Sequence, residues 1–94
     1  MFVRDKLRLN RWGRIKIRYM LTAKQLPDEF ITNALDEIDD QHYLEILREE
    51  LSRKRMQIRD GDPFKVRAKL LRFGQQRGFE SGLIFQVLEE LEKT

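Results

Sequence analysis

The sequence predicts an all-α protein built from two tandem three-helix repeats. Three observations support this fold class. Apolar residues recur at helical spacing along most of the 94 residues, turn signals separate six such segments, and the chain matches itself after a shift of 53 residues. With 40% hydrophobic and 37% charged residues, the chain can form one small core beneath a heavily charged surface.

The internal repeat aligns residues 14–39 with residues 67–92, without a gap over 26 positions. Five positions carry the same residue in both copies: Arg14 and Arg67, Lys16 and Lys69, Ile31 and Ile84, Leu35 and Leu88, Glu37 and Glu90. The repeat also settles an ambiguity. "RIKIRY" alternates polar and apolar residues as a strand would, but its partner "RAKLLR" does not, so both segments are predicted to be helical.

Turn and cap residues bound the expected helices. Proline is tolerated in a first helical turn, aspartate and serine cap helix starts, and glycine favours helix ends. Pro27, Asp39 or Asp40, Pro63 and Ser81 are therefore expected at helix starts, and Gly78 after a helix end. The six expected helices cover residues 2–10, 12–23, 27–38, 40–57, 63–76 and 81–92. The first three form one unit, residues 1–39, and the last three form a second, residues 40–94.

A short corner joins the last two helices of each unit. In the second unit it is Arg77-Gly78-Phe79, where Gly78 can adopt the positive φ that a sharp stop requires and Phe79 is expected to fill the corner. In the first unit Gln25 replaces the glycine, and Leu26 is expected to fill the corner. Because glutamine tolerates positive φ less well, we expect a different geometry there.

Charge alternates along the chain. Residues 1–24 carry a net charge of +7, residues 27–50 carry −8, residues 53–77 carry +7 and residues 78–94 carry −3. Such blocks either pair with one another inside the fold or present a basic surface to an acidic partner.

Little in the sequence indicates catalysis or metal binding. The single histidine, His42, suggests an ordinary surface residue, and "RDGDP" at residues 59–63 lacks the further ligands of a calcium loop. There is no cysteine, no phosphate-binding glycine loop and no apolar run near the roughly 20 residues that span a membrane. We expect a cytoplasmic protein that is not an enzyme and uses no cofactor, metal, membrane or small-molecule substrate.

The basic clusters are the candidate binding residues. They are Arg11, Arg14, Lys16, Arg18, Arg53, Lys54, Arg55, Lys65, Arg67, Lys69 and Arg72. The alternative interpretation is a solvated helix face opposite the core, or, for residues 53–55, cations that complement a helix C-terminus. Trp12 is expected to fill a core or corner position, with partner contact as the alternative.

"RAKLLRFGQQRGFESGLIFQVL" resembles the C-terminal repeat of RecX, the bacterial regulator of the RecA recombinase. The resemblance is carried by Arg67, Phe73, Arg77, Gly78, Phe79, Ile84, Val87 and Leu88. The segment at residues 14–39 is similar to the preceding repeat, on Arg14, Ile15, Lys24 and Leu26, although Gln25 stands where that family usually has glycine.

The resemblance implies the last two of three repeats in an elongated, curved helical array. It implies a partner, the RecA–single-stranded-DNA filament, whose ATP hydrolysis, strand exchange and repressor cleavage the family opposes. Two other hypotheses remain open from the residues themselves. The chain could bind nucleic acid directly through its basic clusters, or it could be a helical scaffold whose charge blocks pair internally.

Overall fold

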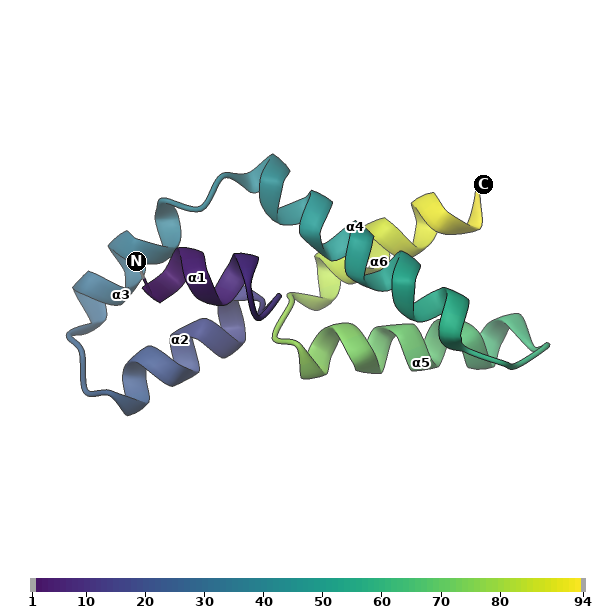
Figure 1. Ribbon diagram of the computed structural model, residues 1–94, viewed down its shortest axis with the longest axis horizontal. Helices are drawn as coiled ribbons and strands as arrows, with labels where there is room; N and C mark the ends of the chain where they lie inside the picture. The colour runs from purple at the N-terminus through teal and green to yellow at the C-terminus, as the bar shows by residue number, and fades with distance from the viewer. Residues whose placement is uncertain (1, 94) are drawn as a thin grey trace.

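The computed structural model describes residues 2–93, which form helices and no strand (Figure 1). The helices are α1 (Phe2–Arg8), α2 (Arg14–Ala23), α3 (Asp28–Asp36), α4 (Asp40–Gln57), α5 (Pro63–Gln76) and α6 (Ser81–Glu92). The all-α prediction is confirmed. The molecule is elongated, with extents of 46 × 23 × 21 Å. In Figure 1 helices α1 to α3 occupy one end, α5 and α6 occupy the other, and α4 leads from the first group across the second.

One hydrophobic core runs through both groups of helices. It includes Ile17, Ile31 and Leu35 from α2 and α3, and Leu47, Leu51 and Leu88 from α4 and α6. Helix α2 packs on α3, while α4, α5 and α6 pack on one another. Each helix contributes an apolar face at a spacing of three or four residues, which the repeat predicts. Trp12 is partly buried against this core, as its interpretation as a corner residue requires.

The two corners have the same backbone geometry. Gln25 has a φ of 64° and Gly78 a φ of 90°. In the first corner Leu26 N–H donates to the carbonyl five residues earlier, and Phe79 does the same in the second. The residue before each of them donates to the carbonyl three residues earlier, which completes a Schellman motif at the end of α2 and of α5. The expectation of a different geometry at Gln25 is therefore wrong, because the hydrogen-bonding pattern that ends the helix dictates the positive φ.

The filling of the two corners differs. Phe79 is 1% exposed and stacks at a tilt on Tyr43, with ring centroids 5.3 Å apart. Leu26 is 45% exposed, so the prediction that it fills the first corner is wrong. The physical reason is that α4 covers the second corner through Tyr43.

One helix start and one capping residue differ from the prediction. Helix α2 begins at Arg14 rather than residue 12, because Arg11 has a φ of 57° and Gly13 is extended. Helix α6 begins at Ser81, with Glu80 as its N-cap residue, so serine is not the cap. The side chain of Glu80 makes no cap bond because it turns toward α2, as described below. Of the two predicted cap candidates, Asp39 rather than Asp40 caps α4, accepting from His42 N–H at 2.9 Å.

Candidate partner-binding surface

The two units meet where the corner between α5 and α6 crosses the start of α2. Gly13 N–H donates to the Arg77 carbonyl at 2.7 Å, and Ile15 N–H donates to the Gly78 carbonyl at 3.0 Å. These bonds satisfy N–H groups that a helix start leaves without a carbonyl partner. A Cβ atom on Gly13 would overlap the Gly78 carbonyl, and one on Gly78 would lie 2.6 Å from the Lys16 backbone nitrogen. The crossing therefore requires glycine on both segments.

Side chains add further contacts between the units on either side of the crossing. We call the crossing and these contacts together the joint. The Arg77 guanidinium donates to the Asn10 carbonyl at 3.2 Å. The Arg11 guanidinium pairs with Glu49 of α4 at 2.8 Å. Both contacts link residues between α1 and α2 to the second unit, so the joint fixes the start of α2 against two elements.

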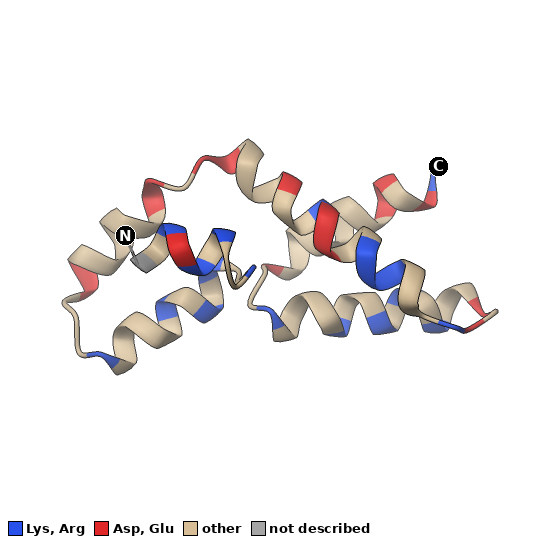
Figure 2. Cartoon of the chain, in the orientation of Figure 1, with Lys and Arg blue, Asp and Glu red and all other residues tan. Residues whose placement is uncertain are grey.

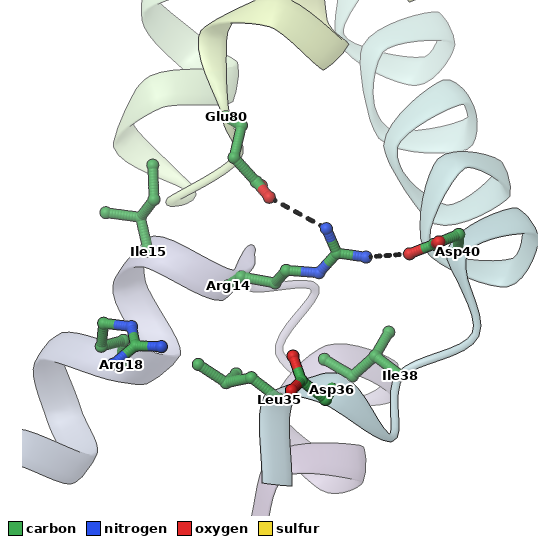
Figure 3. Close-up of a pocket in the computed structure, with 8 residues that line it drawn as sticks. All are labelled: Arg14, Ile15, Arg18, Leu35, Asp36, Ile38, Asp40 and Glu80. Atoms are coloured by element: carbon green, nitrogen blue, oxygen red, sulfur yellow. Dashed lines mark hydrogen bonds and ion pairs between the residues drawn. The ribbon is translucent and has the colours of Figure 1, made fainter. Parts of the chain in front are cut away.

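Arg14 is the centre of a polar network at the joint. Its guanidinium pairs with Asp40 at 2.6 Å and with Glu80 at 3.1 Å (Figure 3). It also lies over the Tyr43 ring, 4.0 Å from the centroid. The Tyr43 hydroxyl accepts from Arg14 N–H at 2.8 Å and donates to Glu80. Three elements, the starts of α2, α4 and α6, are thus connected through one arginine.

The network shifts the ionisation of its members. Burial raises the pKa of Tyr43 well above its ordinary value, and the hydrogen bond to Glu80 adds to the shift. Burial alone would lower the pKa of Arg14, but the charge and hydrogen bond of Glu80, together with smaller contributions from Tyr43 and Asp40, raise it. At neutral pH the network therefore contains a charged guanidinium and a neutral phenol.

A pocket of about 480 Å³ opens beside this network (Figure 3). Its apolar lining comes from Ile15, Leu35 and Ile38. Its charged lining comes from Arg14, Arg18, Asp36, Asp40 and Glu80. The pocket therefore lies between α2, the end of α3 and the beginnings of α4 and α6, where the two units meet.

Comparison with known families identifies both units. Residues 1–35 match the model of the second three-helix domain of RecX, and residues 40–88 match that of the third. The chain belongs to the RecX family. It is 32% identical over 90 residues to the regulatory protein RecX of Clostridium acetobutylicum, an alignment covering 92% of this chain and 42% of that protein. It is 37% identical over 90 residues to the regulatory protein RecX of Prosthecochloris aestuarii, covering 96% of this chain and 57% of that protein.

This RecX-family chain thus spans about half the length of the curated relatives it matches. Both relatives are named as regulatory proteins rather than after a reaction. No solved structure gives a significant match. Among residues 2–93, no group of three or more His, Cys, Asp or Glu could hold a metal ion. No described helix is long and apolar enough to span a membrane.

Two of the predicted cations, Arg11 and Arg14, belong to the joint. Others pair within their own unit: Arg18 lies 3.6 Å from Asp28, Arg53 pairs with buried Glu50 at 2.6 Å, Lys69 lies 3.4 Å from Asp60, and Arg67 pairs with Glu92. The pairs between two exposed side chains contribute little stability, roughly 0–1 kcal/mol each, and they leave the cation accessible to a partner. Arg53 differs, because the carboxylate that it pairs with is buried.

The remaining predicted cations contact rings, backbone or solvent. Lys16 lies over Trp12 at 4.6 Å from the ring centroid, and Lys54 lies over Phe73 at 5.3 Å. Arg55 donates to the Leu91 carbonyl at 3.1 Å. In the part of the chain that the structure describes, Lys65 and Arg72 are exposed and have no hydrogen bond, ion pair or ring contact. These two are the least constrained of the predicted binding residues.

The fold sorts the charge blocks to opposite edges. Helices α2 and α5 carry cations and no acidic residue, and they lie along one long edge of the molecule (Figure 2). Acidic residues gather on α3, on the α3–α4 connection and along α4 near the opposite edge (Figure 2). The alternation seen in the sequence therefore becomes a separation in space, although ion pairs at the joint bridge it.

Sequence reasoning did not single out Tyr43 or Glu80 for the joint. Tyr43 falls on the apolar face of α4 by its spacing, and nothing in the sequence around Glu80 indicates a contact with α2. Gly13 gave a weak signal, since a glycine near a helix start has several explanations. Only the pairing of Gly13 with Gly78 in space explains both glycines.

Proposed function

We propose that this protein binds the RecA–single-stranded-DNA filament and inhibits its activities, including ATP hydrolysis, strand exchange and repressor cleavage. The observation that carries the proposal is the match of both three-helix units, in the right order, to the second and third domains of RecX. On this view, residues 1–39 and 40–94 act as two successive modules of a cytoplasmic DNA-repair regulator, with no chemistry of their own.

Shape and charge support the proposal. The molecule is 46 Å long and about half as wide, which suits a binder that follows an extended surface. The cation-only helices α2 and α5 lie on the same edge, so a partner carrying DNA phosphates would meet Lys65, Lys69 and Arg72 without crossing an acidic helix. These three lie at a spacing of four and three residues and therefore share one face of α5.

The experiment is a titration of the protein into a RecA ATPase assay that contains single-stranded DNA. We expect the ATPase rate to fall as the protein is added. The double substitution Lys65→Glu with Arg72→Glu should raise the concentration needed for half inhibition by about tenfold or more, because two exposed cations are replaced by anions. A control for each of the two charge reversals made singly is Lys93→Glu, which makes the same charge change on an exposed residue directly after α6. Full ATPase activity with the folded protein in large excess over RecA would contradict the proposal.

Direct binding to nucleic acid is the second candidate. It is favoured by the accessibility of Lys65 and Arg72, which have no acidic partner among the described residues. It predicts binding to single-stranded DNA in the absence of RecA. The affinity should fall as salt rises, with a slope of about 0.7 per phosphate contact on a logarithmic plot. Binding that is absent, or that salt does not weaken, would exclude this candidate.

A further inference from the structure

The pocket between the two units has a lining suited to protein rather than to nucleic acid. Ile15, Leu35 and Ile38 are the apolar part of its lining, and Ile15 is 55% exposed. Two arginines and three carboxylates line it, which leaves it with a net negative charge. The Arg14 guanidinium is already occupied by Asp40 and Glu80, so it is not available to a phosphate group.

Asp36 differs from the other carboxylates of the pocket. Its side chain is exposed, and within residues 2–93 its carboxylate has no hydrogen bond or ion pair. Figure 3 shows it at the end of α3, across the pocket from Arg18. Arg18 itself is directed to α3, where it lies 3.6 Å from Asp28 and 3.4 Å from the Thr32 hydroxyl. The pocket thus offers an unpaired carboxylate beside apolar side chains.

The internal repeat provides an independent comparison. A pocket of about 370 Å³ lies between α5 and α6 in the second unit. Shifting the sequence by 53 residues superposes part of its lining on the first pocket: Arg14 on Arg67, Leu35 on Leu88, Ile38 on Leu91. The carboxylates of the second pocket are already paired, Asp60 with Lys69 and Glu92 with Arg67. Both pockets therefore have apolar lining residues at equivalent positions. Of the two, the first pocket has an unpaired carboxylate and the second does not.

We infer that the pocket between the units is a docking site for a segment of the filament's protein subunit that carries an aliphatic side chain next to a lysine or arginine. This inference rests on the proposed function. The aliphatic side chain enters over Ile15, Leu35 and Ile38, and the cation pairs with Asp36. Tyr19 is 73% exposed and lies one turn beyond Ile15 on α2, so it extends the apolar surface out of the pocket. The protein thus meets the subunits of the filament with this face and its DNA with the cationic edge.

The test uses two substitutions in the pocket, each with a control outside it. Asp36→Lys is compared with Glu89→Lys, which lies at the equivalent position of the second unit and is also exposed. Ile15→Ser is compared with Met56→Ser, because Met56 is 87% exposed and lines neither pocket. For each variant, two affinities are measured: for the RecA–single-stranded-DNA filament, and for single-stranded DNA alone.

We expect Asp36→Lys and Ile15→Ser to lose filament affinity by about tenfold or more, while their affinity for DNA alone and their thermal midpoints stay close to the wild-type values. The two control variants should bind the filament within about twofold of wild type. Pocket variants that bind the filament as well as their controls would overturn the inference and leave the proposed function standing. An equal loss of affinity for free DNA would also overturn it, because the pocket would then contact nucleic acid. A wild-type protein that fails to bind the filament would overturn both.

Discussion

The two corners of the repeat share one backbone geometry but have different surroundings. Gln25 and Gly78 both have positive φ, and equivalent hydrogen bonds end α2 and α5. The first corner is exposed, whereas the second is covered by α4 and lies against the start of α2. Glutamine is tolerated in the first corner because its side chain is exposed. Glycine is needed in the second because the Lys16 backbone passes where a Cβ atom would stand.

This difference shows how an internal repeat becomes an oriented pair of units. The second corner supplies two carbonyl groups that accept hydrogen bonds from the start of α2. Glu80, next to this corner, accepts hydrogen bonds from Arg14 and Tyr43. The orientation of the units then determines the pocket between them, since its lining comes from both. Residues of the joint are therefore expected to affect partner binding through the geometry of the pocket as well as through stability.

Removing the side chain that fills each corner should give the largest contrast. Phe79→Ala is expected to lower the free energy of unfolding by about 3–5 kcal/mol, because a fully buried aromatic ring leaves a cavity. Leu26→Ala should cost less than about 1 kcal/mol, since its side chain is already half exposed. Urea unfolding followed by circular dichroism measures both. Equal losses for the two variants would mean that the first corner is as well covered as the second.

Adding a side chain at the glycine of the joint should have the next largest effect. Gly78→Ala is expected to lower the free energy of unfolding by about 2–4 kcal/mol, through the strain of positive φ and the overlap with α2. The same urea experiment measures the loss, and Gly82→Ala is the control, because a Cβ atom there meets nothing within 4 Å. A Gly78→Ala variant as stable as the Gly82→Ala variant would contradict the close crossing.

The sequence predicted the helices and the repeat because both depend on local patterns. Apolar spacing, Asp39, Pro63 and the match at a shift of 53 residues were sufficient for the six helices. The predictions were wrong where contacts between the two units determine the local structure. Ser81 is a good cap in isolation, but Glu80 occupies the cap position because its carboxylate reaches Tyr43 and Arg14 across the joint.

The candidate binding residues show the same limit. Arg14 and Lys65 look alike in the sequence, since both are basic residues near the start of a basic helix. In the fold Arg14 is held by two carboxylates, whereas Lys65 is exposed and has no partner among the described residues. The difference lies in whether the fold brings carboxylates from distant parts of the sequence close to the cation, which the sequence around each residue does not reveal. Whether each of these cations contacts a partner stays a prediction.

The buried hydroxyl of the joint should make the protein sensitive to alkaline pH. Tyr43 has a pKa raised above its ordinary value in the folded protein, so it stabilises the fold fully below about pH 10, the value of an unfolded tyrosine. Above that pH the unfolded chain releases the proton first, and wild type should lose about 1.4 kcal/mol per pH unit relative to Tyr43→Phe. At pH 7 the variant should be less stable by about 1–2 kcal/mol, because Glu80 and Arg14 N–H lose a hydrogen-bonding partner.

Urea unfolding of both proteins at pH 7, 10 and 11 measures the difference between their free energies of unfolding. That difference should shrink above pH 10. The two proteins differ only in the Tyr43 hydroxyl, so the contributions of all groups that they share cancel in the comparison. A constant difference across the three pH values would show that Tyr43 ionises as easily in the fold as in the unfolded chain.

The smallest effect is expected when the residue of the first corner is replaced by glycine. Comparing it with the reverse substitution in the second corner distinguishes backbone strain from steric overlap as the reason for glycine. Gln25→Gly relieves a positive φ, which costs a non-glycine residue about 1 kcal/mol, but it adds conformational freedom to the unfolded chain, worth about 0.4–1 kcal/mol. The net change in the free energy of unfolding should therefore stay within about 0.5 kcal/mol. Gly78→Gln should be destabilising by several times more, because the added side chain also meets Lys16. If backbone strain alone selected glycine, the two substitutions would have effects of similar size and opposite sign, which the same urea titrations would reveal.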